Sequence, residues 1–206
     1  MNLLRTYDTA ATDVLLELVN IGVGRAACGL SELTGREVVI AVPTLEMLEY
    51  GQRRVFDESQ TTITLRVSQA FSGEINGHAL IVLNRNGAVR LTQILLGKTA
   101  EDDAFDDNEL GAMLELGNII MGNVVGVLAS ELDSPVNYQM PQLQLCGVAS
   151  YQDLIADLTP SGEARLLIMR ASLTIEADKV SGYLMLLFQE ADLSCLFEKL
   201  DGLAAS

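Results

Sequence analysis

The chain is poor in several residue types on which common activities depend. Its 206 residues contain no Trp and only 5% aromatic residues, which argues against surfaces that stack on bases or sugars. Lys and Arg number 13 against 28 Asp and Glu, so a formal charge of -15 disfavours binding to nucleic acid and to anionic lipid. The partners that we expect are therefore neutral or carry a basic patch.

Cysteine and histidine are too few and too scattered for most metal and redox sites. The three cysteines, Cys28, Cys146 and Cys195, form no CxxC pair, so the sequence predicts neither a disulfide framework nor a zinc site. We expect Cys28 and Cys195 to be small core residues of helices. His78 is the single histidine and lies in an alternating apolar run typical of a strand. Catalytic triads, HExxH zinc sites and histidine proton shuttles are therefore disfavoured.

Targeting and membrane-spanning segments are also not predicted. Residues 1–10 contain one Arg and no apolar h-region, so we expect no signal peptide. The apolar segment 110–129 has the composition of a membrane span, but Glu115 near its middle would cost about 2–3 kcal/mol or more in lipid. Its four glycines weaken a spanning helix further. We expect instead a central helix of a soluble, cytoplasmic domain without membrane insertion.

The sequence contains a two-fold internal repeat. Residues 13–43 align without a gap with residues 111–141, at an offset of 98, and an offset of 105 relates residues 73–77 to 178–182. A repeat of this length indicates a duplicated unit rather than a solenoid, whose periods run about 20–50 residues. We predict a single domain over residues 1–206. It is built of two repeats, about 8–97 and 107–202, which an acidic connector, 98–106, joins.

Both repeats predict the same elements. A long helix comes first, a strand leads to a proline, two longer strands follow, and a short closing helix ends at a glycine. The predicted fold is therefore α+β, a pseudo-two-fold duplicated unit with a long helix, about three strands and a short closing helix in each half. The predicted ranges are 10–34, 36–42, 61–67, 75–84 and 88–96, then 107–131, 164–175, 179–189 and 192–200.

A narrow polar stripe follows the first long helix. Asp13, Glu17 and Asn20 are spaced i, i+4 and i+7, which places them within about 40° on one face of an otherwise apolar helix. Such residues are ordinary on a solvent-facing helix. Alternatively, the Asn could be a structural device that caps or bridges at the pseudo-two-fold interface.

The second long helix repeats the stripe. Glu115 and Asn118 keep the spacing of the first pair, whereas Gly111 replaces the leading Asp. The apolar positions around the stripe changed between the copies, but Glu, Asn and the later proline kept their type and spacing. This retention favours a function over a solvated helix face.

A Glu and an Asn three residues apart suit the positioning of a water molecule. Without His, Cys or a metal they are poorly suited to covalent catalysis. A neutral amide can accept from and donate to a water beside a phosphoryl anion without repelling that anion, as a carboxylate would. Phosphoryl transfer needs mainly positioning and electrostatic stabilisation from the protein. A Glu one turn away can pair with a cation on a partner.

The spacing Asp/Ser-x3-Glu-x2-Asn-x22-Pro resembles that of the CheC/CheX/FliY family of phosphatases, which act on phosphorylated CheY in chemotaxis. The resemblance covers nearly the whole chain. CheC proteins are the most similar members, because CheX retains one motif and FliY adds a further C-terminal domain. Gly111 departs from the pattern. The matching residues are Asp13, Glu17, Asn20 and Pro43 in the first repeat, and Glu115, Asn118 and Pro141 in the second.

The resemblance implies a CheC-like fold and a mechanism. Asn20 or Asn118 would orient water for in-line attack on the regulator's aspartyl phosphate, and Glu17 or Glu115 would contact the regulator's lysine. Asp13, Pro43 and Pro141 would support these residues. No cofactor would bind to this chain, since Mg2+ belongs to the response regulator. The receptor deamidase CheD is a further candidate partner, to which no residue can be assigned.

Two alternatives remain at the level of sequence. The chain could be a non-catalytic scaffold or a CheD-binding adaptor of the chemotaxis and flagellar switch system. The related FliM lacks the Glu/Asn pair, so the retained pair favours the phosphatase. Between the two sites, we expect the first to be the better catalyst because it keeps Asp13. Gly111 also removes a charge near the phosphoryl anion, which argues for the opposite order.

Overall fold

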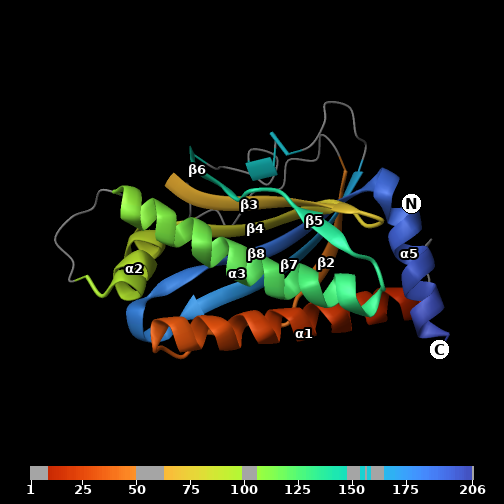
Figure 1. Cartoon of the computed structure of the whole chain (residues 1–206), viewed down its shortest axis with the longest axis horizontal. Coiled ribbons are helices and arrows are strands. Elements are labelled where there is room, and N and C mark those ends of the chain that lie inside the picture. The colour runs from red at the N-terminus through yellow and green to blue at the C-terminus, as the bar shows by residue number, and fades with distance from the viewer. Residues whose placement is uncertain are drawn as a thin grey trace.

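Two long helices cover one face of an antiparallel sheet. The computed structural model describes residues 9–49, 63–98, 106–147, 154–155, 157–158 and 165–205. Helices α1 (Thr9–Thr34) and α3 (Asp107–Glu131) lie side by side and run in opposite directions across an eight-stranded sheet (Figure 1). This arrangement confirms the predicted α+β fold.

The sheet is assembled from both halves of the chain. Its centre is formed by β3 and β4 from the first half and by β7 and β8 from the second, and β4 pairs with β8. The short strands of each half pair with the other half: β1 and β2 pair with β7, while β5 and β6 pair with β3. Neither half therefore completes its own part of the sheet. The strands are β1 (Val39–Ile40), β2 (Thr44–Glu49), β3 (Ile63–Gly73), β4 (Gly77–Asn84), β5 (Val136–Tyr138), β6 (Gln142–Gly147), β7 (Arg165–Ile175) and β8 (Val180–Gln189).

Local sequence signals set the ends of the helices. Helix α2 (Arg85–Leu96) begins at Asn84, whose side chain accepts from the Gly87 N–H, and ends at Gly97 with φ of 63°. That left-handed backbone favours glycine. Helix α3 begins with a reciprocal capping box between Asp106 and Glu109. The two N-terminal caps satisfy N–H groups of the first turns, and the Gly97 N–H satisfies carbonyl oxygens of the last turn of α2.

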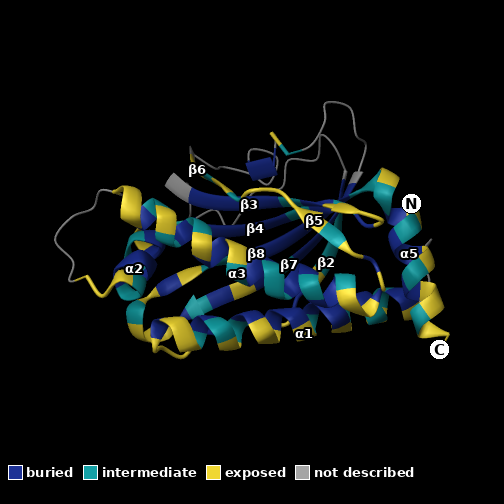
Figure 2. Ribbon diagram, viewed as in Figure 1, coloured by how far each residue is buried: buried dark blue, intermediate teal, exposed yellow. Residues whose placement is uncertain are grey.

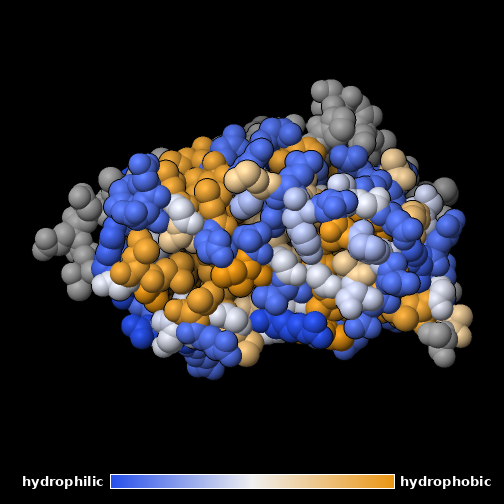
Figure 3. Space-filling view, in the orientation of Figure 1, coloured by the Kyte–Doolittle hydropathy of each residue, from blue (hydrophilic) through white to orange (hydrophobic). Residues whose placement is uncertain are grey.

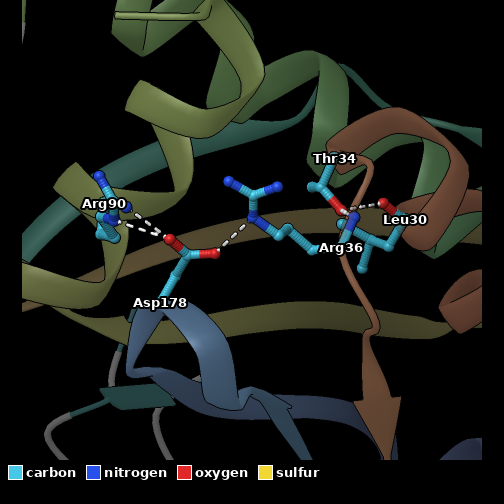
Figure 4. Close-up of polar contacts among 5 residues, drawn as sticks. All are labelled: Leu30, Thr34, Arg36, Arg90 and Asp178. Carbon is cyan, nitrogen blue, oxygen red and sulfur yellow. Dashed lines mark hydrogen bonds and ion pairs between the residues drawn. The ribbon is translucent and has the colours of Figure 1, made fainter. Parts of the chain in front are cut away.

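An ion-pair cluster fixes the end of α1 (Figure 4). Asp178, in the short 3-10 helix η2 (Glu176–Asp178), accepts from Arg36 Nε at 2.9 Å and from Arg90 Nε at 3.1 Å. Burial raises the pKa of Asp178, but the hydrogen bonds from the two arginines outweigh it and hold the pKa below its ordinary value. The cluster thus ties the end of α1 to α2 and to the β7–β8 connection.

Apolar side chains of both long helices pack on the sheet. Figure 2 shows buried positions along the sheet-facing sides of α1 and α3, and exposed ones along their outer sides. The helices approach closely at Gly22, where a Cβ would lie 2.8 Å from Val124 Cα. This close approach gives the packing reason for that glycine. Gly24 and Gly122, also next to the stripes, would meet nothing within 4 Å.

The same two helices have the length and hydropathy of membrane spans. Within an apolar window of 18 residues in each helix, 39% of the window in α1 and 50% of the window in α3 is buried within the fold. Core helices pass such a test as readily as membrane helices do, so it is weak evidence for a span.

The structure corrects several details of the sequence prediction. The strand expected over residues 61–67 is β3, which continues to Gly73. The strand expected over residues 36–42 is only Val39–Ile40, and a longer strand, β2, follows Pro43. Proline lacks the N–H that a sheet requires, so it separates two strands here instead of ending one. The last helix, α5 (Glu190–Ala204), continues through Gly202 instead of stopping there. Cys28 is exposed on α1 and Cys195 is half-buried on α5, so neither is the fully buried core residue that the sequence predicts.

Part of the predicted connector lies outside the described residues. Its described ends, Lys98 and Asp106, form an ion pair with an Nζ–Oδ2 distance of 2.9 Å. The hydrogen bond with Asp106 raises the pKa of Lys98, and the bond with Lys98 lowers the pKa of Asp106. The division into two repeats stays a prediction.

Candidate phosphatase site

The first polar stripe lies on the outer face of α1. Asp13 and Glu17 are exposed and Asn20 is half-buried. Within the described part of the chain, no hydrogen bond or ion pair holds any of these three side chains. The carboxylates and the amide are therefore available to a partner.

The second stripe lies on α3, and one of its side chains is held. Glu115 and Asn118 are both exposed. Asn118 Oδ1 accepts a hydrogen bond from Gln69 Nε2 at 3.1 Å, and the same nitrogen donates to the backbone oxygen of Gln139 at 2.9 Å. Gln69 lies on β3 and is only 2% exposed. Sequence reasoning missed Gln69, because it is 49 residues from the Asn that it holds.

The two predicted prolines occupy equivalent places next to the stripes. Pro43 lies between β1 and β2, and Pro141 lies between β5 and β6. Two residues earlier in each case, the backbone N–H bonds to the neighbouring strand: Ala41 to the Ser172 oxygen at 2.8 Å, and Gln139 to the Ala70 oxygen at 2.9 Å. The backbone at each proline is thus anchored to the sheet in the same way.

An exposed apolar residue precedes each proline. Val42 is 71% exposed and Met140 is 85% exposed, and the offset of 98 relates them. Ile21, next to Asn20, is 39% exposed. Figure 3 shows that the face carrying α1 and α3 mixes polar and apolar side chains. These residues were also missed, although the offset of 98 that pairs the prolines was available to identify Val42 and Met140.

Strand pairing shows which residues of β3 and β7 correspond. Tyr138 pairs with Phe71, and its counterpart Ile40 pairs with Leu173, so the offset between the two strands is 102. This value lies between the offsets of 98 and 105 read from the sequence. The counterpart of Gln69 is therefore Ala171.

The two sites do not form a metal site. Among the described residues, no group of three or more His, Cys, Asp and Glu side chains is placed to hold a metal ion. What the arrangement supplies, twice, is an exposed carboxylate one helical turn from an amide, which is half-buried in the first site and exposed in the second. Those groups can orient a water and pair with a cation, and both tasks require a partner that brings the reacting group.

His78 lies on β4, as the alternating pattern predicts. Burial lowers its pKa, and the charge of Arg66 lowers it further, against a smaller opposing effect of Asp157. Arg66 is buried and binds both carboxylate oxygens of Asp157, at 2.7 and 2.6 Å. His78 is therefore a strand residue held toward the neutral form.

Two family models match the chain in adjacent parts. A CheC-like family model matches residues 11–47, and a chemotaxis phosphatase CheX model matches residues 66–145. Each matched part contains one Glu/Asn pair and the proline that follows it.

Two relatives from Bacillus subtilis (strain 168) extend this match. The CheY-P phosphatase CheC is 24% identical over 136 residues, which cover 65% of this chain and 65% of CheC. The flagellar motor switch phosphatase FliY is 23% identical over 139 residues, which cover 66% of this chain and 36% of FliY. Together, the two family models and these two relatives support the CheC/CheX/FliY family for this chain. The matched part spans less than two thirds of the length of either relative.

Solved structures of the CheC/CheX/FliY family share the fold. FliY from Thermotoga maritima superimposes with a TM-score of 0.73 at 19% identity, over 95% of this chain and 98% of that one. CheX in the crystal structure of the CheX-CheY-BeF3-Mg+2 complex from Borrelia burgdorferi gives a TM-score of 0.52 at 17% identity, over 82% and 96% of the two chains. These similarities concern the fold.

Proposed function

We propose that this chain is a phosphatase that hydrolyses the aspartyl phosphate of a CheY-type response regulator. The observation that supports this most is the Glu/Asn pair that each long helix presents at its surface with the same spacing. Membership of a family that includes a CheY-P phosphatase supports it independently. The remaining details, including the roles of individual residues, belong to the proposal.

In this mechanism the asparagine amides position the attacking water. Asn20 and Asn118 are accessible from solvent, and an amide is neutral, so it can hold a water close to the phosphoryl group without electrostatic repulsion. The water oxygen forms a new bond to phosphorus as the bond from phosphorus to the aspartyl oxygen breaks. Aspartate leaves as a carboxylate, and inorganic phosphate takes up the oxygen and both protons of the water. Mg2+ on the regulator would stabilise the phosphoryl charge.

The glutamates would recognise the regulator. Glu17 and Glu115 are exposed, and neither pairs with a cation among the described residues. Each is therefore free to form a charge-assisted hydrogen bond with a lysine of the partner. Val42 and Met140 would add apolar contact beside each site, since both are exposed next to the anchored prolines. The net charge of -15 would favour approach to a basic patch.

The non-catalytic alternative remains a matter for experiment. A scaffold or a CheD-binding adaptor has no need to keep two exposed Glu/Asn pairs. CheD remains a candidate partner, and we propose a cytoplasmic location, where a response regulator would be met.

The experiment is the decay of a phosphorylated cognate regulator with and without this protein. We expect the protein to accelerate the decay. Asn86→Ala is the matched control for changes at the two sites, because Asn86 is also an exposed helical Asn but lies on α2. No acceleration at protein concentrations that saturate the regulator would overturn the phosphatase proposal.

A further inference from the structure

We infer that Gln69 is a positioning residue that orients the Asn118 amide, and that the first site has no such residue. The inference rests on the proposed function and concerns how well each asparagine is held for it.

A backbone carbonyl fixes the orientation of both amides. The Gln139 oxygen can only accept, so the group of Gln69 that lies 2.9 Å from it must be the NH2. The same nitrogen lies 3.1 Å from the Asn118 side chain, which must therefore present its oxygen. Amide orientation is normally inferred from such networks, and here one unambiguous acceptor determines it. Asn118 Nδ2 consequently points away from Gln69 and stays available as a donor.

The anchor itself is held on the sheet. Gln139 donates its own N–H to the Ala70 oxygen at 2.9 Å, and its carbonyl oxygen accepts from the Gln69 side chain. Both backbone groups of Gln139 are therefore bonded to residues of β3. Gln69 is 2% exposed, which restricts its rotamers. One hydrogen bond thus connects Asn118 to Gln69 on a central strand of the sheet, and a second holds the Gln69 amide in place.

Gln69 carries a cost that an apolar residue would avoid. Its Oε1 is buried and has no hydrogen-bond partner among the described residues. A buried acceptor without a partner destabilises a fold, and such a group in a native structure calls for an explanation. Placing the NH2 between two carbonyl oxygens supplies one, because the amide must then turn its oxygen away from them.

The first site lacks the equivalent contact. The counterpart of Gln69 is Ala171, which is buried and has no polar side chain. The backbone bond from Ala41 to Ser172 persists, so only the side-chain anchor is missing. A small apolar cavity lies there, with Val19, Pro43 and Ala171 among its lining residues. Asn20 is accordingly without a hydrogen-bond partner in the described structure.

The packing beneath the two sites differs in a matching way. Gly117 lies beneath the second stripe, and a Cβ there would approach Val67 Cγ1 to 2.6 Å. At the corresponding position of the first site the residue is Val19, with Ala171 opposite. Small Gly117 accompanies large Gln69, whereas larger Val19 accompanies small Ala171. The contact that Gly117 permits is with Val67, two residues from Gln69 on β3, and it lets α3 lie close to this strand.

An anchored amide should favour catalysis at the second site. Asn118 Oδ1 keeps one lone pair for a water, and its Nδ2 has a fixed direction, so less orientational freedom is lost when the water is bound. The Asn20 side chain, which has no such anchor, must instead become ordered when the water binds. The second site is thus expected to be the better catalyst, whereas the presence of Asp13 favoured the first.

The first test measures steady-state dephosphorylation of the regulator in an Asn20→Ala background, where only the second site acts. Gln69→Met preserves side-chain length and removes both hydrogen bonds. We expect kcat to fall about three- to tenfold with little change in KM, since the Asn118 side chain loses one neutral hydrogen bond. In an Asn118→Ala background with Asn20 intact, where only the first site acts, Gln69→Met should cause no additional loss. Gln93→Met removes another buried amide, from α2, and serves as the control.

The second test needs no substrate. NMR order parameters of the side-chain NH2 groups should show Asn118 restricted and Asn20 mobile, and Gln69→Met should make Asn118 as mobile as Asn20. Unchanged mobility of Asn118, or an unchanged kcat, overturns the role of Gln69. If the parent protein dephosphorylates no regulator, the proposed function fails, while the NMR comparison still decides whether Gln69 positions Asn118.

Discussion

The two Glu/Asn sites share a frame and differ in what surrounds the asparagine. Each has a long helix, a Glu and an Asn one turn apart, and a proline segment bonded to the sheet through one backbone N–H. The first site adds the exposed carboxylate of Asp13. The second adds a buried amide, Gln69, that holds Asn118.

This difference separates two contributions that a single site would combine. An exposed carboxylate acts on the approach and binding of a charged partner, which salt screens. A buried anchor acts on the orientation of the reacting group, which affects kcat. Because each of the two sites has one of these features, they can be measured separately in one chain.

Removing both asparagines should have the largest effect. We expect Asn20→Ala combined with Asn118→Ala to lower dephosphorylation by about 100-fold or more, because neither site can then orient water. Both residues lie at helix surfaces, so circular dichroism and the melting temperature should change little. Dephosphorylation at the parent rate would show that the asparagines are not the catalytic groups.

Removing both glutamates should weaken binding more than turnover. Glu17→Gln with Glu115→Gln should raise the Kd for the regulator about tenfold, since each loses a charge-assisted hydrogen bond. The parent complex should weaken as salt is added, and the variant complex should weaken less. Calorimetric titration at two ionic strengths measures both.

The chain offers a control of equal charge for this variant. Glu37→Gln with Glu131→Gln also removes two exposed carboxylates, away from the stripes. An equal loss of affinity in this control would attribute the effect to net charge rather than to the two sites.

Transferring the anchor should have a smaller effect. In an Asn118→Ala background, Ala171→Gln with Val19→Gly gives the first site the residues found beneath the second. We expect kcat of the first site to rise about threefold, on the scale of one neutral hydrogen bond. Glycine within α1 costs about 1 kcal/mol in stability. The single variant Val19→Gly controls for that loss, and a kcat equal to that of this control would argue against the anchor.

Periodicity and spacing predicted the helices and the stripes but not their surroundings. Helices α1 and α3 follow from a 3.6-residue apolar pattern, and the polar stripe follows from the i, i+4, i+7 spacing. The strands after Pro43 and Pro141 were missed because proline interrupts the pattern that marks a strand.

Long-range pairing was beyond local signals. Each half gives its short strands to the other half, so the neighbours of β7 and β3 depend on contacts far apart in sequence. The correspondence between Gln69 and Ala171 depends on this pairing, because their offset of 102 is absent from the alignable segments. The support beneath Asn118 therefore became visible only in the folded chain.

The rate at which a phosphorylated regulator loses its phosphate, with the parent protein, Asn20→Ala and Asn118→Ala, is the most direct test of this account. The parent should accelerate the loss, Asn20→Ala should retain most of the acceleration, and Asn118→Ala should lose most of it, because Gln69 holds only Asn118. A parent without effect would contradict the phosphatase proposal. A greater loss from Asn20→Ala, or equal losses from both, would contradict the claim that the anchored amide makes the second site the better catalyst.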